Sequence, residues 1–185
     1  NRVDAEGFEP YARDPETLAR PWAIPGSAGL EHRVGGLEKS SGSGHVSYDA
    51  LNHETMTDLR AAKVARVADR LPPLEVEGDP DGDLLVVGWG STYGAIAAAV
   101  KTARRAGLRV GHAHLRYLNP LASELGTILG RYRNVLVPEI NAGQLADILR
   151  ARYLVAVEQQ NKMQGQPFKE SEILERIEAL CAADA

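Results

Sequence analysis

The sequence contains a single cysteine, Cys181, and few aromatic side chains, which make up 5% of its 185 residues. One cysteine cannot form an internal disulfide, which fits a reducing cytosol, so we expect a cytoplasmic protein. Nor can it hold an iron–sulfur cluster within one chain, because such a cluster takes about four thiolate ligands. No apolar run reaches the ~18 residues of a transmembrane helix and no signal peptide is visible, so we expect no membrane insertion.

Several sequence motifs of common enzyme classes are also missing. There is no P-loop, CxxC, HExxH or nucleophile elbow,. Basic residues are not interleaved with aromatic ones, which argues against binding of nucleic acid. The apolar fraction of 44% fits a globular core, and the length suits one domain with an attached piece,. Because the sequence begins at Asn1 rather than Met, we expect it to be part of a longer subunit.

Charge is unevenly distributed along the chain. Residues 1–71 carry nine basic and eleven acidic side chains, residues 72–83 carry five acidic and no basic ones, and residues 84–169 carry eleven basic and four acidic ones. Such asymmetry is typical of boundaries between modules.

The first 50 residues are rich in proline and glycine, which interrupt both helices and strands,. Only a turn of helix at Asp14–Arg20 is expected there. Residues 53–71 predict a helix with Asn52 as N-cap, ended by Pro72 and Pro73, and residues 72–83 predict an acidic surface linker. Large apolar side chains indicate that the first segment wraps another body: Phe8, Tyr11, Trp22, Ile24, Leu30 and Leu37.

From Leu84 onward, short apolar runs alternate with amphipathic segments. This order predicts an α/β domain over 84–185, with a mainly parallel sheet and helices on both faces. Strands are expected at Leu84–Val87, Leu108–Leu115, Asn134–Ile140 and Leu154–Glu158, and helices at Thr92–Ala106, Ser123–Tyr132, Gly143–Tyr153 and Ser171–Ala183.

A glycine-rich turn at Gly88–Gly94 follows the first expected strand and opens a helix. Free N–H groups at such a helix start suit an anion, so a dinucleotide site is one interpretation. However, the spacing is G-x-G-x-x-x-G, and no acid for a ribose occurs between Asp83 and Glu124,. The other interpretation is an ordinary strand-to-helix turn in a parallel sheet.

His112 and His114 alternate along one strand and therefore share a face. Two histidines can ligate a metal, but no third ligand follows at a suitable spacing,. We therefore expect histidines of a core or an interface, and no metal site.

Polar side chains follow the expected strands at the edge where parallel sheets bind ligands. Arg116 could pair with a carboxylate or phosphate, or form an ion pair at a seam between subunits or domains. Asn141, Lys162 and Gln164 could converge there with Glu139 as a site, or form a network that docks a neighbour.

The stretch Glu31–Lys39 combines acid, base and histidine beside flexible glycines,. His32, Arg33 and Lys39 are therefore further candidates for a site. The alternative is a structural loop held by its own ion pairs.

These motifs together resemble a known family. The chain contains, in order, WAIPGSAGLEHRVGGLEKSSGSG, GWGSTYGA, LRYLNPL, VLVPEINAGQLADILRARYL and NKMQGQPF. This series is similar to the C-terminal part of the α subunit of 2-oxoacid:ferredoxin oxidoreductases, most of all the 2-oxoglutarate type of actinobacteria. The resemblance implies that residues 84–185 match a domain like the transketolase C-terminal domain, and that residues 1–71 end the preceding thiamine-pyrimidine-binding domain.

The resemblance also implies an activity: oxidative decarboxylation of 2-oxoglutarate to succinyl-CoA with reduction of ferredoxin. Thiamine diphosphate, Mg²⁺ and a [4Fe–4S] cluster would be held mainly by a partner β subunit, and none by this chain alone. Partners would be the rest of the α subunit and the β subunit in an α2β2 assembly, with ferredoxin, CoA and the 2-oxoacid. No catalytic residue is expected in this part. His32, Arg33, Lys39, Arg116, Asn141, Lys162 and Gln164 are candidates for contact with CoA or the active-site region.

Three alternatives remain open at this point. The chain could use pyruvate or another 2-oxoacid as a member of the same family, since the recognising residues would lie outside it. It could be a stand-alone nucleotide-binding module built on Gly88–Gly94. It could also be a scaffold for dimerisation without a ligand.

Overall fold

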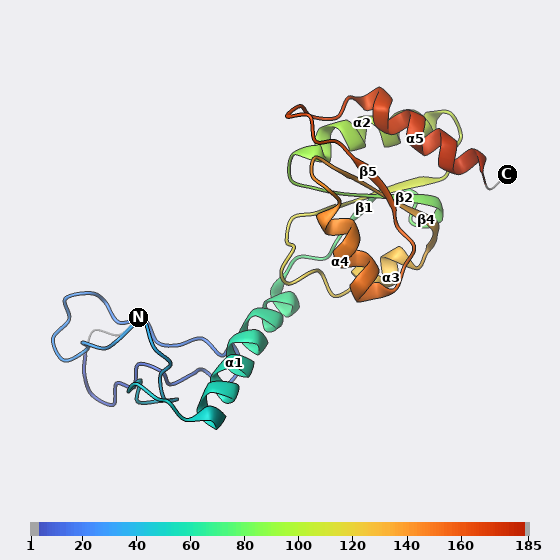
Figure 1. The fold of residues 1–185 in the computed structure, drawn as a ribbon. Helices are drawn as coiled ribbons and strands as arrows, with labels where there is room; N and C mark the ends of the chain where they lie inside the picture. Colours follow the sequence, from blue (N-terminus) through green and yellow to red (C-terminus); the bar gives the residue numbers. More distant parts are fainter. Residues whose placement is uncertain (1–3, 184–185) are drawn as a thin grey trace. The chain divides into compact units, whose positions relative to one another are not determined.

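The computed structural model describes residues 4–183, which form two compact units divided between Arg70 and Leu71. We call them the N-terminal unit and the C-terminal unit, and Figure 1 shows the fold of each. In the described residues no helix is long and apolar enough to cross a membrane.

The N-terminal unit is mostly irregular, as predicted. Before α1 its described residues form no helix or extended strand, and isolated bridges join Tyr11 to Gly42 and Lys39 to Val46. The helix α1 (Ala50–Ala65) follows and continues into the short 3₁₀ helix η1 (Arg66–Arg70). The segment predicted as a turn of helix at Asp14–Arg20 forms one such turn, closed by the hydrogen bond from Leu18 N to the Asp14 carbonyl at 2.8 Å.

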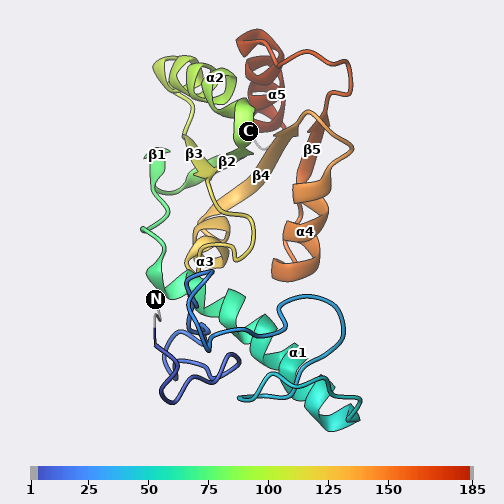
Figure 2. The same ribbon diagram turned by 90° about the vertical axis from the view of Figure 1, so that its left-hand side faces the viewer.

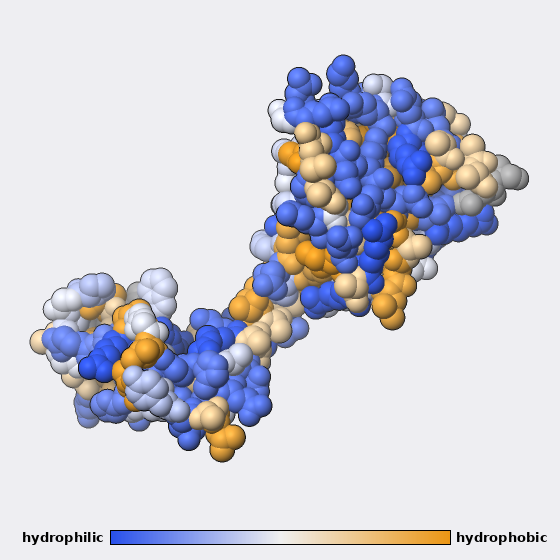
Figure 3. Space-filling view, viewed as in Figure 1, coloured by the Kyte–Doolittle hydropathy of each residue, from blue (hydrophilic) through white to orange (hydrophobic). Residues whose placement is uncertain are grey.

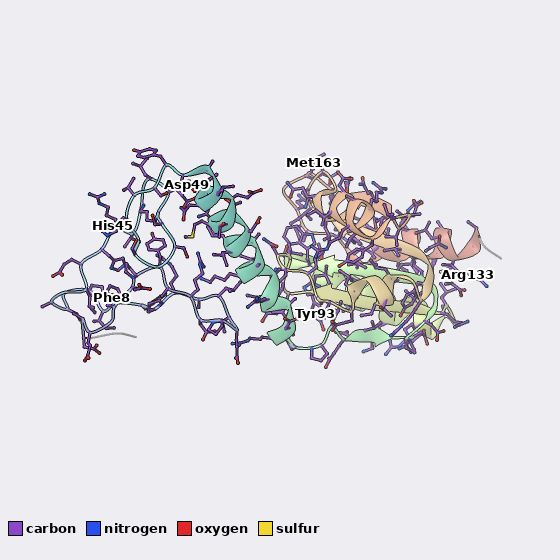
Figure 4. All side chains as sticks on the ribbon, turned by 90° about the horizontal axis from the view of Figure 1, so that it is seen from below. Phe8, His45, Asp49, Tyr93, Arg133 and Met163 are labelled. Carbon is purple, nitrogen blue, oxygen red and sulfur yellow. The ribbon has the colours of Figure 1, made fainter. Side chains whose placement is uncertain are left out.

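The start of α1 differs from the prediction. Its N-cap is Asp49, labelled in Figure 4, whose side chain accepts from Asn52 N at 2.7 Å. Asn52 lies inside the helix, and its Nδ2 donates to the Lys39 carbonyl at 2.9 Å. The predicted N-cap was therefore wrong by three residues, because the carboxylate of Asp49 is the better acceptor for free N–H groups.

Few apolar side chains are covered in the N-terminal unit. Tyr11, Leu18, Leu30 and Met56 are buried, whereas Trp22 is 77% exposed and Leu37 56% exposed. Figure 3 shows apolar residues at the surface of this unit. Three of the side chains expected to be covered by wrapping, Trp22, Ile24 and Leu37, are therefore exposed within the described residues.

The C-terminal unit is built on a five-stranded sheet in the order β1-β3-β2-β4-β5, seen in Figure 2. The pairs β2·β3, β2·β4 and β4·β5 are parallel, and β1 pairs antiparallel with β3. The elements are β1 (Val76–Gly78), β2 (Gly82–Trp89), η2 (Gly90–Thr92), α2 (Tyr93–Arg105), β3 (Val110–Leu115), α3 (Leu125–Leu129), β4 (Tyr132–Glu139), α4 (Gln144–Tyr153), β5 (Glu158–Asn161) and α5 (Glu170–Ala182).

Helices cover both faces of this sheet, which confirms the predicted α/β class (Figure 1). On one face α2 and α5 pack over Leu84, Val86 and Leu136. On the other, α3 and α4 pack over Leu85 and Val87. Since successive strand residues point to opposite faces, the unbroken run in β2 is the pattern of a strand buried on both sides.

Three predictions about the C-terminal unit were wrong. Residues 72–83, expected to be a linker, contain β1, which is held by its pairing with β3. The last strand begins at Glu158 rather than Leu154, because Leu154 takes a left-handed conformation (φ 54°) at the end of α4. Ser123 does not cap α3, and its hydroxyl donates to Glu124 Oε2 instead.

Candidate functional site

The strand order has a topological switch point between β2 and β4. The connection from β2 leads to β3 on one side, and the connection from β3 leads to β4 on the other. In open parallel sheets, ligands bind outside the carboxyl ends of the strands where the order reverses in this way. The loops at this point begin at Trp89 and at Glu139, so their side chains decide what the crevice can hold.

The glycine-rich turn after β2 is set mainly by internal contacts. A Cβ at Gly88 would lie 2.5 Å from Ile96 Cδ1, 3.1 Å from Thr92 Oγ1 and 3.2 Å from His114 Nδ1, so a larger residue would require these side chains to shift. Gly90 has a φ of +58°. Thr92 Oγ1 accepts from Trp89 N at 3.2 Å and donates to the Trp89 carbonyl at 2.9 Å, which closes the turn. These contacts support the interpretation as a strand-to-helix turn.

Glu139 is the last residue of β4, at the point where the strand order reverses. Its carboxylate is fully buried and accepts from the indole Nε1 of Trp89 at 3.1 Å and from Leu145 N and Ala146 N at 2.9 and 3.1 Å. The N-terminus of α4, which would attract a phosphate, thus receives an anion from the chain itself. The alternative of a nucleotide site gains no support from this geometry.

Asn141 joins the same network. Its Nδ2 donates to Glu139 Oε1 at 3.1 Å, and its Oδ1 accepts from Gly143 N at 2.7 Å and Gln144 N at 3.0 Å. The expected proximity of Glu139 and Asn141 is therefore present. All of these contacts are internal, so the pair orders the loop that enters α4.

Lys162 and Gln164 do not share this network through their side chains. Lys162 is 7% exposed, and its Nζ donates to Glu172 Oε2 at 2.7 Å and to the Pro167 carbonyl at 3.1 Å. The hydrogen bond from Lys162 lowers the pKa of Glu172 below its usual value. Gln164 is exposed in the loop before α5. The predicted four-residue convergence is thus wrong for these two side chains.

A cluster of rings lies over β3 in the C-terminal unit. Tyr93, labelled in Figure 4, lies with its ring 5.5 Å from that of His112 and 5.0 Å from that of His114. Its hydroxyl donates to Glu77 Oε1 at 2.8 Å, a bond that raises the pKa of Tyr93. His112 is 1% exposed with neither ring nitrogen hydrogen-bonded within residues 4–183, and burial lowers its pKa to about 4. His112 is therefore a core histidine.

A cavity of about 570 Å³ opens beside this cluster. Tyr93, His114 and Glu77 contribute to its wall, and the exposed Arg116 follows β3 there. Burial and the charge of Arg116 together lower the pKa of His114, so a neutral imidazole faces the cavity near neutral pH,. Arg116 is thus a candidate residue that is exposed and accessible to an anion.

The three candidates in Glu31–Lys39 have different surroundings. His32 packs edge-on against Phe8, with 5.4 Å between ring centroids, and its Nδ1 lies 2.8 Å from the Leu30 carbonyl. Arg33 is exposed. Lys39 is 3% exposed, and its Nζ donates to the carbonyls of Gly35 and Leu37. The loop is thus held both by backbone acceptors for Lys39 and by the ion pair of its Glu38 with Arg60, as the alternative interpretation expected.

Lys39 lines a second cavity, of about 750 Å³, inside the N-terminal unit. Four basic residues that we did not single out from the sequence surround it: Arg13, Arg20, Arg60 and Lys63. They come from the irregular segment and from α1, so no spacing along the chain brings them together. In residues 4–183 no group of three His, Cys, Asp or Glu side chains could hold a metal ion.

Comparisons with known proteins agree with the resemblance. Residues 82–173 match the family "Pyruvate:ferredoxin oxidoreductase core domain II". The chain is 54% identical over 179 residues to "2-oxoglutarate oxidoreductase subunit KorA" of Mycobacterium tuberculosis, covering 96% of this chain and 27% of that protein. It is 28% identical to "2-oxoglutarate synthase subunit KorA" of Methanothermobacter thermautotrophicus, covering 80% of this chain and 39% of that one.

A solved structure matches both in sequence and in fold. It is the 2-oxoglutarate:ferredoxin oxidoreductase of Magnetococcus marinus with 2-oxoglutarate, coenzyme A and succinyl-CoA bound, at 28% identity and a TM-score of 0.86, over 95% of this chain and 31% of that one. The chain thus spans about a third of that structure and less than half of either curated relative. On these matches the chain belongs to the 2-oxoacid:ferredoxin oxidoreductase family, and its C-terminal unit carries core domain II of that family.

Proposed function

We propose that this chain is the C-terminal part of the α subunit of a 2-oxoglutarate:ferredoxin oxidoreductase. The observation that carries the proposal is the 54% identity over 96% of the chain to a 2-oxoglutarate oxidoreductase subunit. The reaction would convert 2-oxoglutarate and CoA to succinyl-CoA and CO₂, with two electrons passed to ferredoxin. The chain would work with the rest of the α subunit and with a β subunit in an α2β2 assembly.

The cofactors of this reaction belong, in the proposal, mainly to the β subunit. Thiamine diphosphate with Mg²⁺ supplies the carbanion chemistry that releases CO₂ from a 2-oxoacid. A [4Fe–4S] cluster takes about four thiolates, and Cys181 is the one cysteine of this chain, so these residues do not fit the cluster by themselves,. This part of the subunit would contribute structure and interfaces, which agrees with the internal saturation of Glu139 and Asn141.

Reconstitution tests the proposal. The 185-residue chain by itself should not decarboxylate 2-oxoacids, whereas the assembled α and β subunits should reduce ferredoxin in a CoA-dependent reaction. 2-Oxoglutarate should be preferred over pyruvate. Catalysis by the isolated chain, or a clear preference for pyruvate, would contradict the proposal.

Two variants in the assembled enzyme separate a structural role from contact with the substrate. Lys162→Ala removes an ammonium held by Glu172, and Arg33→Ala removes an exposed guanidinium. We expect modest losses of turnover in both, with an assembly that remains intact in gel filtration. A loss above about 100-fold, equal to about 2.7 kcal/mol, would instead place that residue at the reacting centre.

A further inference from the structure

The cavity of about 750 Å³ in the N-terminal unit has an unusual charge. Its wall contains five permanently cationic side chains and one carboxylate, Glu38. Arg13, Arg20 and Lys39 come from the irregular segment, and Arg60 and Lys63 come from α1. The volume lies in the range of about 300–1,000 Å³ that is typical of sites for small molecules.

Three of these cations, the buried Lys39 and the half-buried Arg13 and Arg20, are oriented by uncharged partners. Arg13 Nη1 donates to the Leu18 carbonyl at 2.9 Å, and the guanidinium of Arg20 lies 4.1 Å from the centroid of the Tyr11 ring. The ammonium of Lys39 donates hydrogen bonds to two backbone carbonyls. These contacts orient the cations without neutralising them, so their charge is available to an anion.

The single carboxylate in the wall, Glu38, already forms an ion pair. Glu38 accepts from Arg60 through both oxygens, at 3.2 and 3.1 Å, and lies 2.9 Å from His53 Nδ1. The bidentate pair lowers the pKa of Glu38 to about 2, so this carboxylate stays ionised.

The other four cations of the wall therefore have no carboxylate partner within residues 4–183: Arg13, Arg20, Lys39 and Lys63. Arg13 Nε and Arg20 Nη1 are buried without any hydrogen-bond partner there. Burial lowers the pKa of Arg13, and the charges of Arg20 and Arg60 add to this effect. Like charges that a fold holds this close repel one another, and a bound anion relieves the repulsion.

We propose that this cavity binds the phosphate groups of a small molecule. Guanidinium groups match phosphate oxygens in a bidentate geometry, and an excess of four positive charges exceeds what one carboxylic acid neutralises,. The inference rests on the proposed function for its sources of ligand, because the reaction uses two diphosphate compounds, CoA and thiamine diphosphate.

Titration calorimetry with sodium pyrophosphate tests the site directly. The sample is the assembled enzyme with thiamine diphosphate and Mg²⁺ already bound, so that the cofactor site is filled. Wild-type enzyme should bind pyrophosphate saturably, and Arg13→Gln/Arg20→Gln should bind it at least tenfold more weakly. Arg105→Gln, a change at an exposed arginine of the C-terminal unit, is the matched control and should bind within twofold of wild type.

Two further variants keep the test decisive if the double variant does not fold. Leu37→Glu introduces a carboxylate at an exposed position of the rim, and Lys63→Gln removes an exposed cation of the wall. Both leave Arg13 and Arg20 in place. We expect Leu37→Glu to abolish binding and Lys63→Gln to weaken it about threefold, with unchanged circular dichroism.

Competition identifies the source of the phosphates. If CoA displaces pyrophosphate from wild-type enzyme while additional thiamine diphosphate does not, the ligand is CoA, and the reverse result assigns the cofactor. Equal pyrophosphate affinity in all variants, or no binding to wild type, would overturn the inference. Succinyl-CoA formation would then still support the proposed function, so the two failures can be told apart.

Discussion

The two units bury very different amounts of apolar surface. Of the hydrophobic side chains buried among the described residues, four lie in the N-terminal unit and twenty-six in the C-terminal unit. The C-terminal unit closes a core on each face of its sheet. The N-terminal unit instead depends on turns, side-chain caps and ion pairs such as Arg60–Glu38.

The C-terminal unit is thus stabilised mainly by burial of apolar side chains, and the N-terminal unit mainly by polar contacts. Buried area stabilises the C-terminal unit at roughly 25 cal/mol per Å² of apolar surface. The N-terminal unit leaves Trp22, Tyr48 and Leu51 more than 70% exposed, so it lacks that contribution within the described residues. We infer that its stability depends more strongly on what it binds, whether a ligand or another polypeptide surface.

The largest effect should follow from opening the core of the C-terminal unit. Leu136 lies in β4 and is fully buried, so Leu136→Ala should lower the free energy of unfolding by about 3 kcal/mol through lost burial and a cavity,. Urea denaturation followed by Trp89 fluorescence in a Trp22→Phe background measures this unit alone. Leu154→Ala, at a leucine of the same unit that is 89% exposed, is the control and should change it by less than about 0.5 kcal/mol,. Equal effects would refute the claim that the buried core stabilises this unit.

Glu139→Gln should be the next largest change. The neutral amide keeps the shape of the side chain but loses the charge that four donors share at the start of α4. We expect a loss of about 2 kcal/mol in the same denaturation assay, since hydrogen bonds to a buried charge are the strong ones. Glu158→Gln, at a half-exposed ion pair with Arg176, should cost less than about 1 kcal/mol,. A smaller loss at residue 139 than at residue 158 would contradict this assignment.

The burial of His112 makes the C-terminal unit sensitive to acid. Its pKa of about 4 lies below the usual 6.5 of the unfolded chain, so protons bind the unfolded chain more strongly between these values. The free energy of unfolding should therefore fall as pH drops from about 6.5 to 4, by about 2 kcal/mol between pH 7.5 and 5. His112→Leu should remove this part of the slope, whereas His45→Leu, at an exposed histidine, should retain it. An unchanged slope in His112→Leu would exclude the buried imidazole as its cause.

The smallest of the four effects concerns a turn in the N-terminal unit. Gly44 has a φ of +72°, and a Cβ there would lie 2.6 Å from Cδ2 of Tyr11. Gly44→Ala should destabilise the unit by about 1 kcal/mol, because alanine disfavours this backbone conformation. Gly35→Ala meets nothing within 4 Å and should have little effect. The rate of limited proteolysis in residues 4–70 reports the difference, and equal rates would show that the turn does not limit stability.

Much of the C-terminal unit could be predicted from the sequence. The unbroken apolar run in β2 and the helical periodicity of α2 and α5 each have one dominant physical cause, burial of the same side chains that the pattern shows. The sequence of β1, Val-Glu-Gly, has no such pattern, since antiparallel pairing with β3 rather than burial holds it in the sheet. The edge strand β5 was predicted four residues too early, because its sequence is polar and pairing with β4 holds it in the sheet.

The candidate site was harder to predict. Glu139 and Asn141 are two residues apart, so their contact followed from local chain geometry. The prediction for Lys162 was wrong because its ammonium donates to Glu172, ten residues further along the chain. The cationic cavity joins Arg13 and Arg20 to α1 through tertiary contacts, which leave no periodic signal in a single sequence. The match of residues 1–71 to the end of a thiamine-pyrimidine-binding domain remains a prediction.

The position of β1 has a mechanical consequence. β1 is the first strand of the C-terminal unit after Arg70 and an edge strand joined to β3 by three residue pairs. Tension applied through the chain from the N-terminal side therefore reaches the sheet at its weakest ladder and loads those pairs before any parallel strand. Under such tension β1 would detach from β3 first, and its residues would add to the length of chain between the two units. The parallel strands β2 to β5 would keep their register.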